Sequence, residues 1–334
     1  MKILVTGCAG FIGFHTVLKL LKEEQDVIGI DNVNNYYDTS LKKSRLTELN
    51  RSKHNGNYQF IKGDLSNKEF LKELFLKNNF DVVIHLAAQA GVRYSINSPQ
   101  SYVESNLIGF MNILETVRNS DVKHFVFASS SSVYGLNEKI PFAVEDPTNC
   151  PVSLYAATKK SNEVLAYSYS HLYKIPMTGM RFFTVYGPFG RPDMAYYSFT
   201  EKISSGKPIE VYNNGEMYRD FTYIDDVTEA IGMIYKQIPE SKDHVNSKSK
   251  APYILYNIGN NNPVSLKEFI GAIERATKKK SIQIHKPMQP GDVYQTYADI
   301  EPLMNDFNLK PKININEGVV KFVDWYNSYR EKKF

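Results

Sequence analysis

The sequence predicts a doubly wound parallel α/β (Rossmann) sheet followed by a smaller α/β part. Short apolar runs alternate with amphipathic helical patterns through the first half of the chain. A glycine-rich turn follows the first apolar run directly. Parallel strands need crossover connections, which are usually helical and right-handed, so this alternation is most economically satisfied by a doubly wound sheet.

Six apolar runs are predicted strands, and in chain order they read KILVTG, DVIGID, YQFIKGD, FDVVIHLA, HFVFAS and PMTGMRFF. Amphipathic stretches such as FHTVLKLLKEE and NKEFLKELFLKN lie between them and predict helices. Further along, proline and glycine interrupt the rhythm, and the polar segment 239–252 predicts a surface loop. We expect one domain over residues 1–180 and a second over 181–334, some segments of which pack back on the first.

The composition is ordinary for a soluble protein. Of 334 residues, 42% are hydrophobic, and 40 basic against 36 acidic side chains give a net charge of +4. The charges are interspersed, so we expect neither nucleic-acid nor membrane binding. Two cysteines and seven histidines show no disulfide framework or metal-ligand spacing, so we expect no metal. The first apolar run is too short for a signal peptide or a membrane span, which indicates a cytoplasmic protein.

Three glycines stand where the first strand meets the first helix, in VTGCAGFIG. Gly7, Gly10 and Gly13 allow a tight turn and a close approach of the backbone to a pyrophosphate, which the helix N-terminus attracts. Asp31 ends the next strand, where its carboxylate can accept from both ribose hydroxyls and repel a 2′-phosphate. These features predict bound NAD rather than NADP. Asp64 ends the third strand and suits either the adenine amino group or an ordinary helix cap.

A tyrosine can act as general base on an alcohol when a lysine one helical turn away favours its phenolate. The Tyr-x-x-x-Lys spacing occurs three times, at Tyr58/Lys62, Tyr155/Lys159 and Tyr329/Lys333. Only Tyr155 opens a long helical pattern, because Tyr58 lies in a predicted strand and Tyr329 in the polar tail. Ser130 ends a strand upstream, so its hydroxyl can face Tyr155 across the cofactor. We expect Tyr155, Lys159 and Ser130 to be the catalytic residues.

With these motifs the sequence resembles the extended short-chain dehydrogenase/reductase family, and within it the nucleotide-sugar epimerases, above all their glucuronate-type members. The resemblance covers nearly the whole chain through TGCAGFIG, HLAAQAGVRYS, SSSSVYG, YAATK, RFFTVYGPFGRPDM, NNGEMYRDFTYIDD and MQPGDVYQTYAD. It implies that Tyr155 takes the proton from the sugar 4-hydroxyl while hydride leaves C4 for a tightly bound, recycled NAD. The 4-keto sugar then turns over and is reduced on its other face. The implied reaction is reversible C4 epimerisation of UDP-glucuronate to UDP-galacturonate.

The glycine turn, the strand ends and the resemblance together give the candidate sites. In the first domain the cofactor candidates are Gly7, Gly10, Phe11, Ile12, Gly13, Asp31, Asn32, Asp64, Leu65, Leu86, Ala87, Ala88, Asn106, Tyr155 and Lys159. The candidates for the UDP-sugar, mostly in the second domain, are Arg93, Ser130, Ser131, Ser132, Thr184, Arg191, Val211, Tyr212, Arg219 and Asp292. By resemblance, Arg219 grips the UDP moiety. Gln289 stands where many members have arginine, which places more of the phosphate charge on Arg219.

The run ASSSSVYG separates this chain from lyases of the same family. Dehydratases and decarboxylases of the family carry an acidic residue between the strand-end serine and VYG, whereas Ser131 and Ser132 stand there in this chain. Hydroxyls can hold a ketone oxygen but are poor general acids or bases near pH 7. The missing acid favours an enzyme that only oxidises and re-reduces, although the serines would also serve simply to end the strand.

A 4-keto glucuronate is a β-keto acid and loses CO2 when its C5–C6 bond aligns with the carbonyl π system. A guanidinium can hold the carboxylate away from that alignment with a bidentate grip. Arg191, in PFGRPDM, is the candidate, with a solvated loop arginine as the alternative and Arg93 as a weaker competitor.

Other readings stay open at this point. The main alternative is C4 epimerisation of another UDP-sugar, such as a UDP-N-acetylhexosamine or its uronate, and a UDP-sugar dehydratase or decarboxylase is a further one. A non-catalytic NAD-binding regulator would be expected to lose Tyr155 or Lys159. The helical stretches 98–118 and 153–172 are rich in apolar residues, and related enzymes pair such helices, so we expect a homodimer, although periodicity also allows these faces to be core.

Overall fold

The computed structural model describes residues 1–51, 56–244, 247–288 and 293–331. The chain divides into two compact units, the first formed by Met1–Asn137, Val144–Phe182 and Thr228–Asn257. The second unit consists of Glu138–Ala143, Phe183–Val227 and Ile258–Phe334. The sequence suggested a boundary after residue 180, with some later segments packing back on the first domain; by contacts, Thr228–Asn257 groups with the first unit and Glu138–Ala143 with the second.

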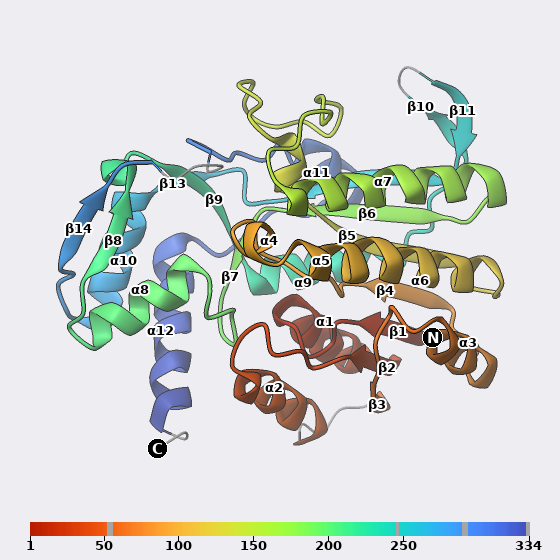
Figure 1. The fold of residues 1–334 in the computed structure, drawn as a ribbon, viewed down its shortest axis with the longest axis horizontal. Coiled ribbons are helices and arrows are strands. Elements are labelled where there is room, and N and C mark those ends of the chain that lie inside the picture. The colour runs from red at the N-terminus through yellow and green to blue at the C-terminus, as the bar shows by residue number, and fades with distance from the viewer. Residues whose placement is uncertain (52–55, 245–246, 289–292, 332–334) are drawn as a thin grey trace. The chain divides into compact units, whose positions relative to one another are not determined.

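The first unit is built on a seven-stranded sheet with the order β12-β6-β5-β4-β1-β2-β3 (Figure 1). Its strands are β1 (Lys2–Thr6), β2 (Asp26–Asp31), β3 (Tyr58–Lys62), β4 (Val82–His85), β5 (His124–Ser130), β6 (Met177–Phe182) and β12 (Tyr253–Ile258). From β3 to β6 every neighbouring pair is parallel. The six predicted strands are therefore confirmed as β1 to β6, and with them the doubly wound fold.

The strand order reverses between β1 and β4. Chain leaving β1 crosses toward β2, and chain leaving β4 crosses toward β5, so the two connections diverge at the carboxyl ends of these strands. Open α/β sheets bind their ligands in the crevice at such a switch point. The fold therefore places the ligand end of the first unit beside β1 and β4.

Helices cover both faces of this sheet. On one face α3 (Lys68–Lys77), α6 (Gly109–Arg118) and α7 (Leu154–Tyr173) pack side by side over a core that includes Phe110, Phe125 and Phe127. Figure 1 shows α6 and α7 in front of the sheet and α9 (Ile224–Ile234) behind it. On that second face α1 (Phe11–Lys22) packs against α2 (Thr39–Arg51), and Lys19 of α1 lies 3.9 Å from Glu229 of α9.

Three strands of the first unit were not expected from the sequence. β12 extends the sheet beyond β6, and the predicted surface loop over 239–252 is wrong because β10 (Lys242–His244) and β11 (Ser247–Ala251) pair there as an antiparallel hairpin. The segment is almost entirely polar, so it lacks the alternation of apolar and polar residues from which a strand is recognised.

The second unit contains two small sheets and four helices among its described residues. The sheets have the orders β13-β9-β7 and β14-β8, formed by β7 (Thr184–Tyr186), β8 (Ile209–Tyr212), β9 (Tyr218–Tyr223), β13 (Pro263–Ser265) and β14 (Gln283–Lys286). The helices are α8 (Ala195–Ser204), α10 (Leu266–Thr277), α11 (Glu301–Phe307) and α12 (Ile315–Glu331), and α10 packs against both α8 and α12. No helix in the part of the chain that the structure describes is long and apolar enough to cross a membrane.

Candidate active site

The glycine-rich turn joins β1 to α1 in a conformation that only small residues permit. Gly7 has a φ of +74°, and a Cβ added there would lie 2.8 Å from the backbone of Ala87. A Cβ at Gly13 would lie 2.1 Å from the carbonyl oxygen of Gly7. Gly10 caps α1 without a side chain, and the first turn of α1, which the structure describes in full, contains no acidic residue. This turn fits a dinucleotide pyrophosphate, which would meet uncrowded amide groups and the positive end of the helix dipole.

Asp31 lies at the end of β2 and is 9% exposed. Its carboxylate accepts hydrogen bonds from the amides of Ala9 (3.2 Å) and Val33 (2.7 Å), and the ammonium of Lys42 lies 3.9 Å from it. Arg45, fully buried on the same helix α2, donates to the carbonyl oxygen of Ala9 (2.8 Å). The sequence did not point to these two cations, whose only signal is a spacing of three residues that places them on one helix face. Lys42 is close enough to Asp31 to offset part of its negative charge.

The ends of β2 and β3 are joined by side chains. The amide of Asn32 donates to Asp64 Oδ2 (2.8 Å), while Asp64 Oδ1 accepts from the backbone N–H of Ser66 (2.9 Å). The N-cap of α3 is Asn67, which accepts from the amide of Phe70. Asp64 is therefore not the helix cap, and it stands next to Asn32 at the carboxyl edge of the sheet.

The remaining backbone candidates gather at the ends of β1 and β4. The amides of Leu86 and Ala87 donate to the carbonyl oxygen (3.2 Å) and hydroxyl (3.1 Å) of Thr6. Ala88 follows them, half-buried. At the start of α1, Phe11 is buried and Ile12 is half-buried, and Leu65, which follows β3, is buried.

Asn106 lies in a π-helical segment, η1 (Val103–Ile108), and is buried. Its amide accepts from the backbone of Gln89 (2.8 Å) and donates to the Gln89 carbonyl (3.0 Å) and the Thr158 hydroxyl (3.1 Å). Asn162 of α7 donates to the Asn106 carbonyl (2.6 Å). Single π turns are frequent at functional sites, and this one ties the segment after β4 to the helix that carries Tyr155.

Tyr155 and Lys159 lie one helical turn apart at the start of α7, which Ser153 caps by accepting from the amide of Ala156 (3.1 Å). Lys159 is buried, and its ammonium donates to the carbonyl oxygen of Ala128 on β5 (3.0 Å). Burial lowers the pKa of Lys159 to about 8, against the nearby carboxylate of Glu163, which raises it. Tyr155 keeps part of its surface exposed, so a buried lysine lies one helical turn from a tyrosine that can reach a ligand.

Of the other two tyrosine–lysine pairs, Tyr58/Lys62 does not have this arrangement and the second is only partly described. Tyr58 lies in β3, and burial raises the pKa of its hydroxyl far from neutrality. Tyr329 stacks on Trp325 in α12, and Lys333 lies outside the described residues.

The serine run spans the end of β5 and a turn of 3-10 helix, η2 (Ser131–Tyr134). The hydroxyl of Ser130 accepts from the backbone N–H of Ser132 (3.2 Å), so this serine does end the strand. Ser131 and Ser132 are half-buried. Ser129 is buried and donates to Glu163 Oε1 (2.7 Å).

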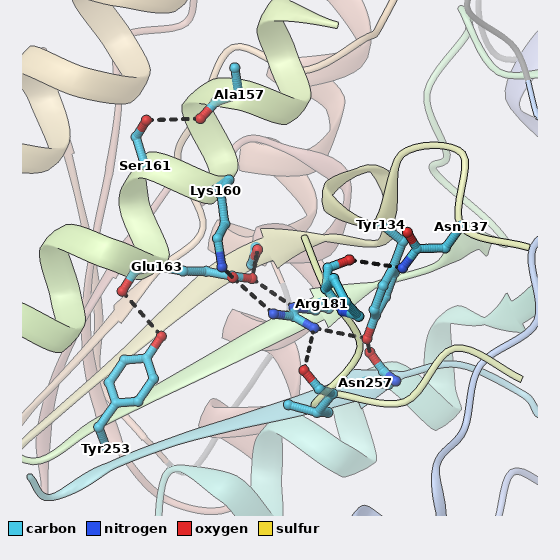
Figure 2. A network of polar contacts seen from close by, with 12 residues as sticks. Tyr134, Asn137, Ala157, Lys160, Ser161, Glu163, Arg181, Tyr253 and Asn257 are labelled. Carbon is cyan, nitrogen blue, oxygen red and sulfur yellow. Dashed lines mark hydrogen bonds and ion pairs between the residues drawn. The ribbon is translucent and has the colours of Figure 1, made fainter. Parts of the chain in front are cut away.

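Beneath α7 lies a buried polar network that the sequence did not indicate (Figure 2). Arg181 of β6 forms a two-pronged ion pair with Glu163, with Nε–Oε1 at 2.8 Å and Nη2–Oε2 at 2.9 Å. The other terminal nitrogen of Arg181, Nη1, donates to the hydroxyl of Tyr134 (2.9 Å). That hydroxyl in turn donates to Asn257 Oδ1 (2.6 Å). Fixed contacts thus link β5, β6, η2 and α7.

The second unit holds Thr184, Arg219 and Arg191 on separate segments. Thr184 opens β7 opposite Phe221 of β9. Arg219 of β9 donates through Nη1 to the carbonyl oxygens of Tyr218 (2.8 Å) and Tyr294 (3.2 Å). Next to it, Asp220 is fully buried and accepts from three backbone amides, those of Asn260, Asn261 and Ala298, so the strand that carries Arg219 is rigidly braced.

Arg191 lies in the loop before α8. Its guanidinium pairs with Asp193 through Nε–Oδ1 (3.1 Å) and Nη2–Oδ2 (2.5 Å), and both side chains are part-exposed. Its backbone N–H donates to the buried hydroxyl of Tyr196 (2.8 Å). The arginine is therefore held in a defined orientation that a carboxylate can engage.

Three further substrate candidates differ in accessibility, and a fourth lies outside the described residues. The side chain of Val211 is buried, so any contact with a nucleoside there would come from its backbone. Tyr212 is half-buried and donates to Glu210 (2.6 Å). Arg93 is exposed before α4 (Tyr94–Asn97) in the first unit. Asp292 is the candidate that is not described.

Known proteins and a family model match this chain over nearly its whole length. A family model described as GDP-mannose 4,6 dehydratase matches residues 4–322. Protein CapI of Staphylococcus aureus is 50% identical over 99% of this chain and 100% of its own length. A Rhizobium meliloti protein named "Probable UDP-glucuronate 4-epimerase" is 45% identical over 99% of this chain and 98% of its own.

A solved structure also matches nearly the whole chain. UDP-glucuronic acid 4-epimerase from Bacillus cereus, in complex with UDP-glucuronic acid and NAD, matches with a TM-score of 0.87 and 33% identity, covering 98% of this chain and 100% of that one. Both the glycine turn and the Tyr155–Lys159 helix lie within the matched family model. The chain therefore belongs to the extended short-chain dehydrogenase/reductase family, in the branch that the GDP-mannose 4,6-dehydratase model describes.

Proposed function

We propose that this protein is an NAD-dependent epimerase that interconverts UDP-glucuronate and UDP-galacturonate at C4. The observation that carries the proposal is that Tyr155 and the buried Lys159 are one helical turn apart on α7, where Lys159 bonds the end of β5, in a fold whose first turn fits a dinucleotide. The relatives named as UDP-glucuronate 4-epimerases, one of them solved with UDP-glucuronic acid and NAD, support the choice of substrate and cofactor.

The chain's own residues would handle the proton and the sugar oxygen. NAD, when bound, supplies the acceptor and the later donor of hydride at C4 of the sugar. Tyr155 takes the proton of the 4-hydroxyl and returns it after the sugar has turned over. The charge of Lys159 stabilises the phenolate form of Tyr155, and Ser130, with Ser131 and Ser132, holds the same sugar oxygen. Gly7, Gly10 and Gly13 would admit the pyrophosphate, while Asp31 holds the adenosine ribose.

The carboxylate of the sugar is assigned to Arg191. Its guanidinium already meets a carboxylate in the side-on two-pronged geometry that such groups prefer. A UDP-sugar without a carboxylate would gain nothing from that fork, which disfavours the neutral hexosamine alternative. Thr184 is assigned to the sugar, Arg219 to the diphosphate, and Val211 and Tyr212 to the uridine.

The lyase alternative is weaker even though the matching family model is named for a dehydratase. Elimination of water beside a 4-keto group needs a general acid, and residues 131 and 132 supply only hydroxyl groups. The residues at the end of β5 therefore favour oxidation and re-reduction without elimination.

We further propose that the protein works as a homodimer in the cytoplasm. Apolar side chains of α7 lie on its outer surface, with Val164 57% and Leu172 62% exposed, and Ile108 at the end of η1 is 45% exposed. η1 and α7 pack together, so these side chains belong to neighbouring elements. Pairing with a second copy would remove them from water.

The first test is incubation of the purified protein with UDP-glucuronate, without added NAD, followed by proton NMR of the sugar. We expect UDP-galacturonate to form without CO2 or net NADH. Tyr155→Phe should lower kcat by about a thousandfold, because general acid–base groups contribute on the order of 10² to 10⁴ to rate, while the protein keeps its bound NAD. A pentose product from the wild type would instead favour a decarboxylase.

The pH dependence of kcat should report Lys159. Its charged form is the one that favours the phenolate, so activity should be retained below its pKa and fall as pH rises through about 8, or lower once the positive nicotinamide is bound. Lys159→Arg keeps its charge at these pH values and should show reduced activity without that alkaline fall. An unchanged alkaline limb in the arginine variant would mean that another group sets it.

Replacement of Arg191 should affect the uronate specifically. Arg191→Gln is expected to raise KM for UDP-glucuronate at least tenfold, since hydrogen bonds to charged groups are worth about 1.5–3 kcal/mol, and to release detectable UDP-pentose and CO2. Arg191→Lys, which keeps the charge but loses the fork, should be intermediate. Equal kinetics in all three proteins would make Arg191 a solvated loop residue.

The oligomeric state can be measured by light scattering. The wild type should have twice the mass of one chain, and the double variant Val164→Glu with Leu172→Glu should be monomeric because buried unpaired charges disfavour the interface. Leu76→Glu, at an 83% exposed leucine of α3, is the control and should remain dimeric. A monomeric wild type would overturn the proposal.

A further inference from the structure

Glu163 is a buried carboxylate that the proposed reaction does not use. It lies on α7 one helical turn after Lys159, and both it and Arg181 have side chains that are only 2% exposed. Burial alone would raise the pKa of Glu163, but the hydrogen-bonded guanidinium of Arg181 and the hydroxyl of Ser129 lower it overall, so the residue is a carboxylate in the fold.

The partners of Glu163 stand directly opposite each other in the sheet. β5 and β6 are parallel neighbours, and their register pairs Ser129 with Arg181. Side chains paired in this way project from the same face of a sheet. Glu163 of α7 accepts hydrogen bonds from both Ser129 and Arg181, and Figure 2 shows its contact with the arginine.

Two successive residues at the end of β5 are thus bound by two successive turns of α7. The carbonyl of Ala128 accepts from Lys159, and the hydroxyl of Ser129 donates to Glu163. Residues four apart lie on one face of a helix, so the two bonds run side by side between strand and helix. They fix both the distance and the register between these elements.

A buried ion pair contributes little net free energy to the stability of a fold. The cost of removing two charges from water roughly cancels their attraction, and a well-packed apolar pair is often as stable. What the ion pair adds is directional: each oxygen of Glu163 has its own partner from Arg181, and one oxygen also receives Ser129. Directional bonds of this kind set geometry more sharply than apolar packing does.

We propose that Glu163 is a positioning residue, which fixes the carboxyl end of β5 against α7 through Ser129 and Arg181. Ser130 follows Ser129 directly, and Tyr155 lies two turns before Glu163, so these bonds set how the two proposed reacting hydroxyls face each other. Small misplacements of reacting groups are expensive in rate. This inference rests on the proposed function for its kinetic readout, although its structural content does not.

The charge of Glu163 also acts on Lys159. Besides Glu163 and the proposed base Tyr155 on α7, the carbonyl of Ala128 from β5 accepts from this ammonium, and His85 from β4 lies within range of its charge. Burial and the charge of Lys159 lower the pKa of His85 to about 3, so the imidazole is neutral. Glu163 is thus the anionic group that supports the charged state of Lys159.

Ser129→Ala tests the positioning role with the least disturbance, because it removes one hydroxyl and leaves the ion pair. We expect kcat to fall about tenfold while KM for UDP-glucuronate and bound NAD stay within twofold, since only the alignment in the reaction is altered. Ser161→Ala is the matched control: its hydroxyl donates to the Ala157 carbonyl of the same helix (2.9 Å), outside the Glu163 contacts. This control should keep wild-type kinetics.

The outcomes separate clearly. A kcat loss confined to Ser129→Ala, at constant KM and per NAD-loaded enzyme, supports the proposal. Equal kcat in both variants overturns it, and so does a loss that disappears once activity is counted per NAD-loaded molecule, because that would show a folding role only.

Amide hydrogen exchange gives a readout that does not depend on the substrate. In Ser129→Ala, peptides covering the end of β5 and the start of α7 should exchange faster than in Ser161→Ala. If the wild type fails to epimerise UDP-glucuronate, the proposed function falls while this comparison still decides the link between β5 and α7. Unchanged exchange would overturn the link itself.

Discussion

Burial of the Lys159 ammonium between β5 and α7 is the constraint on which the candidate site depends. A lysine removed from water favours its neutral form, yet a neutral lysine could not stabilise a phenolate. The structure meets this conflict with the Ala128 carbonyl and the nearby carboxylate of Glu163, which leaves the pKa of Lys159 at about 8. Lys159 is therefore mostly charged at pH 7. Because its pKa lies close to that pH, small changes in its surroundings can change its protonation state.

The same need for a fixed α7 explains several contacts that have no chemistry of their own. Asn106 bonds Gln89 after β4 on one side and Thr158 of α7 on the other. Asn162, farther along the helix, bonds the backbone of the π-helical segment. These are hydrogen bonds in a dry interior, where each satisfied group holds its neighbours firmly and an unsatisfied one would be costly. The sheet edge at β1 and β4 and Tyr155, the proposed general base, are thus parts of one scaffold.

Much of this arrangement could be predicted from sequence, and the failures have a common cause. Apolar periodicity revealed β1 to β6, and the glycine turn and Tyr155 could be recognised because their neighbours in sequence are their neighbours in space. Arg181, Lys42 and Arg45 could not, because a charged residue ordinarily faces water, and the sequence does not show which partner would balance its charge if it were buried. Their partners lie on other segments of the chain. β12 was missed for a related reason, since it joins the sheet only after the chain has passed through the second unit.

The pairing of Arg191 with Asp193 bears on how an enzyme of the proposed kind, whose 4-keto intermediate is a β-keto acid, can be specific for a uronate. An arginine whose fork is already set by a protein carboxylate has lost much of its side-chain freedom before substrate arrives, so less entropy is lost on binding. In the role proposed for Arg191, a uronate either shares that guanidinium with Asp193 or displaces Asp193, and displacement exchanges one carboxylate contact for another of the same kind. A neutral sugar could make no such exchange, because it has no anionic group to take the place of Asp193. Selectivity for an acidic sugar can therefore arise from the internal ion pair as much as from the arginine, in the same way that Glu163 gives Lys159 its charge.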